Sequence, residues 1–166
     1  MIQKLNFAFF VILLSAYACK KKSEGDCNLS IDNDIVTCEA DDTSSSVSGF
    51  TTILYNGSSQ VKSEGNFTNG VRTGFWKYYY SNGELMKEGS YTDGEADGYW
   101  NVYYENGNIQ SQGHFDNCKR NGFWQYYFEE EDYAIQYSGN YEKDEKVGTW
   151  KSFNLAGAEE EIHECN

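Results

Sequence analysis

The 166-residue chain contains no proline and two histidines, and its basic residues are few. Proline is absent while 16 glycines, 14 tyrosines, 10 phenylalanines and 4 tryptophans are present, which favours β-strands joined by glycine turns over helices. Acidic residues outnumber basic ones by 26 to 13, so the long-range field repels phosphate backbones and anionic lipid head groups. Nucleic acid is therefore not a predicted partner. The same charge also keeps a protein soluble.

Long hydrophobic runs are also missing. The run "FAFFVILL", Phe7 to Leu14, is too short to span a bilayer as a helix. With Lys4 in front of it, this run has the charged and apolar regions of an export signal. The following "SAYAC" places small residues before Cys19 and resembles the lipobox of bacterial lipoproteins, although Ala16 stands where that family usually has leucine.

This resemblance implies a lipoprotein signal peptide over residues 1–18, cleavage before Cys19, and lipid attached to that cysteine. Several acyl chains would hold the protein stably on a membrane. The expected location is the bacterial cell envelope, lipid-anchored and either periplasmic or surface-exposed. The alternative is an ordinary secretory signal cut after Ala18, which would leave a soluble exported protein.

Export allows disulfides, and four further cysteines remain after Cys19. Cys27 and Cys38 are close enough in sequence to staple a small hairpin, so we predict a disulfide between them within an acidic tether over residues 19–48. A zinc site does not fit the cysteine spacings, and His114 and His163 have no paired histidine. A calcium loop in "DNDIVTCEADD" would lack the required glycine and terminal glutamate. The sequence therefore predicts no metal and no cofactor.

From Gly49 onward the sequence repeats. The tryptophans recur at spacings of 24, 24 and 26 residues, and one glycine class keeps the same step. These repeat positions are Trp76, Trp100, Trp124 and Trp150, with Gly74, Gly98, Gly122 and Gly148. A period in the twenties indicates a repeat architecture. The stretch "GFTTILYNG", residues 49–57, is interpreted as a half-repeat with Thr51 in place of tryptophan.

The sequence pattern within each unit predicts two strands. In one unit "ELMKEGSY" and "GYWNVYY" are separated by a turn, and Asn-Gly or Asp-Gly pairs recur where glycine's tolerance of positive φ suits a tight turn. We therefore predict an all-β fold, an elongated antiparallel β-meander of four to five hairpin repeats of about 24 residues over residues 49–157. Nine or ten strands at roughly 4.8 Å each give a sheet about 40 Å long. Residues 158–166 are expected to form an acidic C-terminal tail or cap strand.

Strand alternation divides the side chains of each unit between two faces. One face carries the tryptophans and is apolar in every unit. Glycines such as Gly89 leave a gap over which a neighbouring ring can lie. The other face is aromatic at its margins and polar along its middle, where Lys151 also belongs. It is the candidate binding face, with Phe75, Lys77, Tyr79, Tyr99, Asn101, Tyr103, Phe123, Gln125 and Tyr127.

The segments "EGSYTDGEADGYWNVYYENG" and "QGHFDNCKRNGFWQYYFEEE" resemble the bacterial variant of the MORN repeat. Its pattern is glycine, an aromatic residue, a turn, Gly-x-Trp, Tyr-Tyr and Asn-Gly. The departures are Cys118 in place of a turn glycine, the missing Asn-Gly near Glu130, and polar residues at Ser152 and Asn154 that suggest a terminal cap. The resemblance implies an elongated sheet that associates with proteins or membranes and has no conserved chemistry.

An enzyme is not predicted, because the carboxylates fall in turns and tails and His114 occupies a slot that is polar in the other units. The favoured hypothesis is a non-catalytic envelope lipoprotein whose repeat sheet docks or scaffolds an unknown protein partner. The alternative is a glycan-binding lipoprotein that stacks its exposed tyrosines on sugar rings. A third interpretation gives both aromatic faces a packing role only.

The meander also predicts that Cys118 and Cys165 are not bridged, unless the tail "EEEIHECN" folds back along the sheet edge. They would lie about four strands apart, near 17 to 19 Å. A disulfide needs Cα atoms within about 7 Å.

Overall fold

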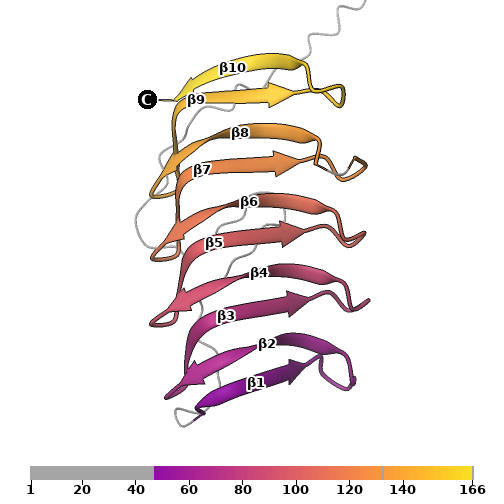
Figure 1. Ribbon diagram of the computed structural model, residues 1–166, viewed down its shortest axis with the longest axis vertical. Coiled ribbons are helices and arrows are strands. Elements are labelled where there is room, and N and C mark those ends of the chain that lie inside the picture. Colours follow the sequence, from indigo (N-terminus) through magenta and orange to yellow (C-terminus); the bar gives the residue numbers. More distant parts are fainter. Residues whose placement is uncertain (1–46, 132, 166) are drawn as a thin grey trace, which may run out of the picture.

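The computed structural model describes residues 47–131 and 133–165, and its ten strands form one open antiparallel sheet in chain order (Figure 1). The strands are β1 Gly49–Leu54, β2 Val61–Thr68, β3 Val71–Tyr79, β4 Leu85–Thr92, β5 Glu95–Tyr103, β6 Ile109–Asp116, β7 Lys119–Tyr127, β8 Ile135–Glu142, β9 Glu145–Phe153 and β10 Glu159–Cys165. The described residues include no helix. The predicted all-β meander of hairpin repeats is confirmed.

Tight turns at one edge of the sheet join β2 to β3, β4 to β5, and so on. Asn69 and Gly70 both have positive φ, 51° and 78°, as do Asp93 and Gly94 at 52° and 86°. Two successive positive φ values define the turn that suits the right-handed twist of paired strands. Each turn also bonds to the preceding repeat, since the Gly94 amide donates to the Arg72 carbonyl at 3.1 Å.

Longer turns at the other edge of the sheet join β1 to β2, β3 to β4, β5 to β6, β7 to β8 and β9 to β10. The Tyr80 amide donates to the Glu84 carbonyl at 2.8 Å within the turn, and the Tyr80 hydroxyl donates to the Tyr103 carbonyl of the next repeat at 2.7 Å. Tyr104 repeats this bond to the Tyr127 carbonyl at 2.9 Å. Both edges therefore link neighbouring repeats by hydrogen bonds in addition to the strand ladder.

The core is a continuous row of aromatic rings on one side of the sheet. We name this side of the sheet the tryptophan face. Neighbouring rings meet edge to face, with centroids 4.9 to 6.3 Å apart and planes inclined by 76° to 90°. Such pairs stabilise by about 0.5–1.5 kcal/mol beyond the burial of their area. The row runs through Phe67, Trp76, Tyr91, Trp100, Phe115, Trp124, Tyr141 and Trp150.

Each tryptophan lies over the glycine of the preceding strand, as expected for Gly89. A Cβ built on Gly89 would stand 2.2 Å from the Trp100 ring. The indole nitrogen also donates to a backbone carbonyl of the same strand, Ser90 in this unit, at 3.2 Å. The other three units repeat both contacts.

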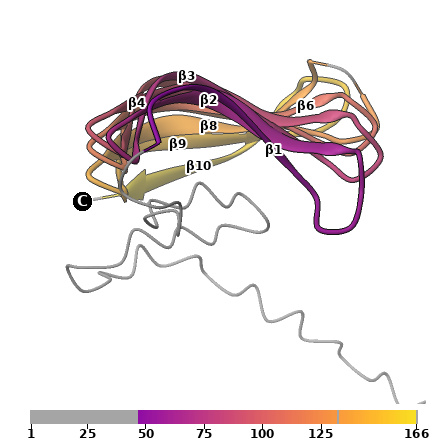
Figure 2. The ribbon, with the colours of Figure 1, turned by 90° about the horizontal axis from the view of Figure 1, so that it is seen from below.

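The repeat glycines produce bulges where the strands bend. Glu64 pairs with Lys77 and Asn66 pairs with Thr73, so three residues of β3 stand opposite the single residue Gly65. Gly74 within the bulge has φ of 68°. Bulges of this kind bend a strand and increase its twist. All the strands bend in the same sense, so the sheet is arched when it is viewed along its long axis (Figure 2).

The two ends of the sheet differ. Strand β1 is the expected half-repeat, in which Thr51 pairs with Gly65 in the register where Trp76 pairs with Gly89. Strand β10 is acidic and exposed along nearly its whole length, with only Cys165 buried. Charged side chains on an edge strand discourage pairing with another chain.

Candidate protein-docking surface

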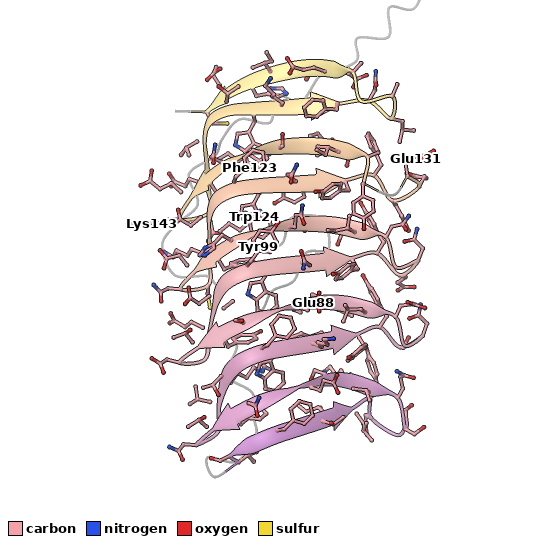
Figure 3. The ribbon with its side chains drawn as sticks, in the orientation of Figure 1. Glu88, Tyr99, Phe123, Trp124, Glu131 and Lys143 are labelled. Carbon is pink, nitrogen blue, oxygen red and sulfur yellow. The ribbon has the colours of Figure 1, made fainter. Side chains whose placement is uncertain are left out.

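The side of the sheet away from the tryptophans, named here the opposite face, carries exposed aromatic side chains in register. Phe75 is 50 % exposed, and Tyr99 and Phe123 are each 54 % exposed. They come from β3, β5 and β7, so neighbours in the row are separated by two strand spacings, roughly 9.6 Å. Tyr99 and Phe123 stand one above the other on the sheet in Figure 3.

Phe50 extends this row to β1, which the sequence analysis did not foresee. Phe50 pairs with Asn66 in the register where Phe75 pairs with Ser90, and it is 67 % exposed. The dipeptide Gly49-Phe50 could have indicated it, since it precedes Thr51 as Gly74-Phe75 precedes Trp76. The four residues Phe50, Phe75, Tyr99 and Phe123 form what we call the exposed aromatic row. It spans about 29 Å, or six strand spacings.

Polar side chains run beside the row, as predicted. Lys77, Asn101 and Gln125 are half-buried, and Lys151 in β9 is exposed. Lys77 stands between Glu64 and Glu88 on the neighbouring strands. The Gln112 side-chain amide donates to that of Gln125 at 3.2 Å. The row is therefore bordered by charged and amide groups.

Three tyrosines at the far margin of the opposite face are fixed by cross-strand hydrogen bonds. The Tyr79 hydroxyl donates to Glu64 at 2.6 Å, and the Tyr103 hydroxyl donates to Glu88 at 3.0 Å. Gln112 takes the glutamate's place in the third unit and donates to the Tyr127 hydroxyl. Desolvation first, and then these glutamates, raise the pKa of Tyr79 and of Tyr103 to about 12.

The candidate residues thus fall into two groups. Phe75, Tyr99 and Phe123 offer open ring surface, whereas Tyr79 and Tyr103 have their hydroxyls bound to carboxylates. Tyr127 is only 5 % exposed and packs within the sheet. Desolvation also raises the pKa of Tyr99 and of Tyr127.

The repeat tryptophans Trp76, Trp100, Trp124 and Trp150 are at most 3 % exposed and belong to the core. The repeat glycines Gly74, Gly98, Gly122 and Gly148 all have positive φ. His114 lies on the opposite face between Tyr99 and Asn121. Within residues 47–131 and 133–165, no group of three or more metal-ligating side chains comes together. The described part of the chain also has no helix long and apolar enough to cross a membrane.

The cysteines are divided between described and undescribed residues. The predicted lipidation site Cys19 and the predicted disulfide pair Cys27 and Cys38 lie outside the described residues. Cys118 is disulfide-bonded, whereas Cys165 is a buried thiol. The prediction that these last two are not joined is therefore confirmed.

The repeating hairpin, with its glycine beneath a tryptophan, can be compared with known repeat families. Residues 72–93 and 96–117 match the MORN repeat variant. Each matched segment begins in the second strand of one hairpin and continues into the first strand of the next, β3 to β4 and then β5 to β6. MORN repeats are in general modules for interaction with proteins or membranes and are generally not catalytic. No curated protein matches the chain.

Proposed function

We propose that this protein is a non-catalytic scaffold that docks a protein partner on the opposite face of its repeat sheet. The observation that carries the proposal is the exposed aromatic row. Its four rings are half or more exposed, whereas the eight rings of the core row on the tryptophan face are at most 3 % exposed. Contiguous exposed apolar side chains rimmed by polar groups mark interaction sites, and aromatic residues are enriched at protein interfaces.

The geometry favours a protein over a glycan as the partner. The tyrosines that the glycan hypothesis needs for stacking include Tyr127, which is buried, and Tyr79 and Tyr103, whose hydroxyls are bound to glutamates. The remaining row is about 29 Å long, which suits an extended protein segment or another protein surface.

The cellular location is the second part of the proposal and rests on the sequence. Cleavage before Cys19 and lipidation there would hold the sheet at a membrane of the bacterial cell envelope, behind the acidic tether. Metabolic labelling with a fatty acid should mark the native chain and leave the Cys19→Ser variant unmarked. Equal labelling of both chains would disprove lipidation at this cysteine.

A crosslinking pull-down from intact cells tests the docking surface. The variant carries Phe50→Ser, Phe75→Ser, Tyr99→Ser and Phe123→Ser, and circular dichroism confirms that it stays folded. The control carries Tyr133→Ser and Leu155→Ser, which change equally exposed apolar residues in the loops. We expect the row variant to lose a protein that the native chain and the control both retain. Retention of every captured protein by the row variant, or loss only of a signal on a glycan array, would reject protein docking at this row.

A further inference from the structure

The two edge strands of the sheet, β1 and β10, differ in charge (Figure 1). Strand β10 carries four glutamates, Glu159, Glu160, Glu161 and Glu164. Residues 47–61, which include β1, contain no aspartate, glutamate, lysine or arginine. In the part of the chain that the structure describes, no further strand pairs with the outer side of β1. Charges usually protect an edge strand from pairing with another chain, and β1 lacks this protection.

The backbone of β1 presents alternate residues to its outer side. The Tyr55 amide donates to the Gln60 carbonyl at 2.9 Å, and the Val47 carbonyl accepts from the Gly70 amide at 2.8 Å. The odd-numbered residues of β1 therefore turn their amide and carbonyl groups toward β2, because these groups alternate in direction along an extended strand. The residues that direct both groups away from the sheet are Phe50, Thr52 and Leu54.

The side chains of these three residues lie exposed on the opposite face. Phe50 pairs with Asn66 and Thr52 pairs with Glu64, which places both on that face. Phe50 is 67 % exposed and Leu54 is 48 % exposed. The outer edge of β1 therefore combines backbone hydrogen-bonding groups with apolar side chains.

A second copy of β1 fits this edge. When two β1 strands run antiparallel about a two-fold axis at Thr52, Phe50 of each copy stands opposite Leu54 of the other. Outward-facing residues then meet only outward-facing residues, so each pair exchanges both of its backbone hydrogen bonds. The apolar side chains cover each other, and two threonines pair at the axis. A shift of two residues in either direction would place Phe50 or Leu54 opposite a residue outside the strand.

Charge favours this pairing over the other edge contacts. Two chains that each carry a net charge of −13 repel one another, so an uncharged strand is the favourable place for them to meet. Pairing β10 with β10 would bring four glutamates from each copy together. Pairing β1 with β10 would set apolar side chains against glutamates and would extend without closing.

We propose that β1 is a homodimer interface, at which two copies of the chain join their sheets edge to edge with Thr52 on the two-fold axis. Paired residues point to the same side, so the exposed aromatic rows of both copies stand on one face of the joined sheet. The dimer does not depend on the docking function, because Thr52 lies outside that row. One strand pair is a small interface, so we expect a reversible dimer with a dissociation constant on the order of 1 μM.

Cysteine crosslinking tests the register. Thr52→Cys brings the Cα atoms of its two copies to about 5.5 Å, a separation that a disulfide spans, whereas those of Phe50→Cys stay about 14 Å apart. The purified full chain is oxidised mildly with copper–phenanthroline and mapped by mass spectrometry without reduction. We expect Thr52→Cys to give a dimer joined at position 52, and Phe50→Cys to be joined at position 50 only to Leu54→Cys in a mixture. Equal crosslinking of Thr52→Cys and Phe50→Cys, or none for Thr52→Cys, would overturn the proposal.

Sedimentation equilibrium of the full chain tests the edge itself. Thr52→Lys brings two ammonium groups together at the axis, and Ile162→Lys is the matched control on β10, where Ile162 is 56 % exposed. Circular dichroism confirms that both variants stay folded. We expect the native chain and the control to dimerise equally and Thr52→Lys to raise the dissociation constant about fivefold. A native chain that stays monomeric at about 100 μM, or an equal effect of both substitutions, would overturn the interface.

Discussion

The indole of Trp100 lies directly on the backbone of Gly89. A Cβ at Gly89 would come within 2.2 Å of the ring, and the indole nitrogen donates to the carbonyl of Ser90, the next residue. The ring is thus fixed from below by the glycine and at its edge by a hydrogen bond. The glycine and the tryptophan of each unit constrain each other, because the ring fills the space that the missing side chain leaves.

Gly89→Ala should therefore destabilise the sheet. The added methyl group must displace the Trp100 ring or bend the strand, and overpacking of this kind costs about 1–3 kcal/mol. Urea denaturation of the two chains measures the loss. In a Trp100→Ala background the same substitution should cost much less, because the ring that it strikes is gone. An equal cost in both backgrounds would show that the collision is not the cause.

The hairpin repeat could be predicted because its signals are local. The 24-residue step of Trp76, Trp100 and Trp124 identifies one repeating unit, and Asn-Gly and Asp-Gly pairs locate its turns. The two faces follow from alternation, because the bulge at Gly74 adds two residues to its strand and leaves the alternation unchanged. The sequence therefore predicts the fold down to the face on which each side chain lies.

The contacts between strands were not predicted, because they depend on register. Tyr79 meets Glu64, 15 residues earlier, only when Lys77 pairs with Glu64 across a bulge. The local pattern of neither strand indicates which of its residues pair across the bulge. Phe50 was missed for a related reason, since Thr51 replaces the tryptophan that marks the other units. The residues of the contact surface could therefore be identified only from the strand register in the structure.

Tyr79 should titrate above its ordinary range. Its pKa rises from 10.0 to about 12 because the hydroxyl is desolvated and donates to Glu64. The folded protein keeps a proton that the unfolded chain loses, so this stabilisation is complete below pH 10 and is lost as the pH rises towards 12. Ultraviolet absorbance of tyrosinate follows the titration. Glu64→Gln should lower the midpoint of one tyrosine, and Glu95→Gln at the exposed start of β5 should not. Identical titration curves for all three chains would contradict the assignment.

Tyr104→Phe should weaken the contact between neighbouring repeats. The substitution removes the hydroxyl that donates to the Tyr127 carbonyl at 2.9 Å and keeps the ring. The expected loss is about 0.5–1.5 kcal/mol, the usual net contribution of one hydrogen bond, measured by urea denaturation. Tyr137→Phe is the matched control, because Tyr137 is exposed and its hydroxyl has no hydrogen bond among the described residues. A larger loss for the control would exclude a role for this edge contact.

Cys165→Tyr should stabilise the C-terminal end of the sheet. Cys165 pairs with Gly148 in the register where Tyr91, Phe115 and Tyr141 pair with the repeat glycines of their own units. A tyrosine there would continue the aromatic row past Trp150 and add an edge-to-face contact, about 0.5–1.5 kcal/mol. Thermal unfolding measures the gain, with Cys165→Ser as the control that removes the sulfur without adding a ring. If tyrosine and serine lower the melting temperature equally, the last strand does not accept a ring at this position.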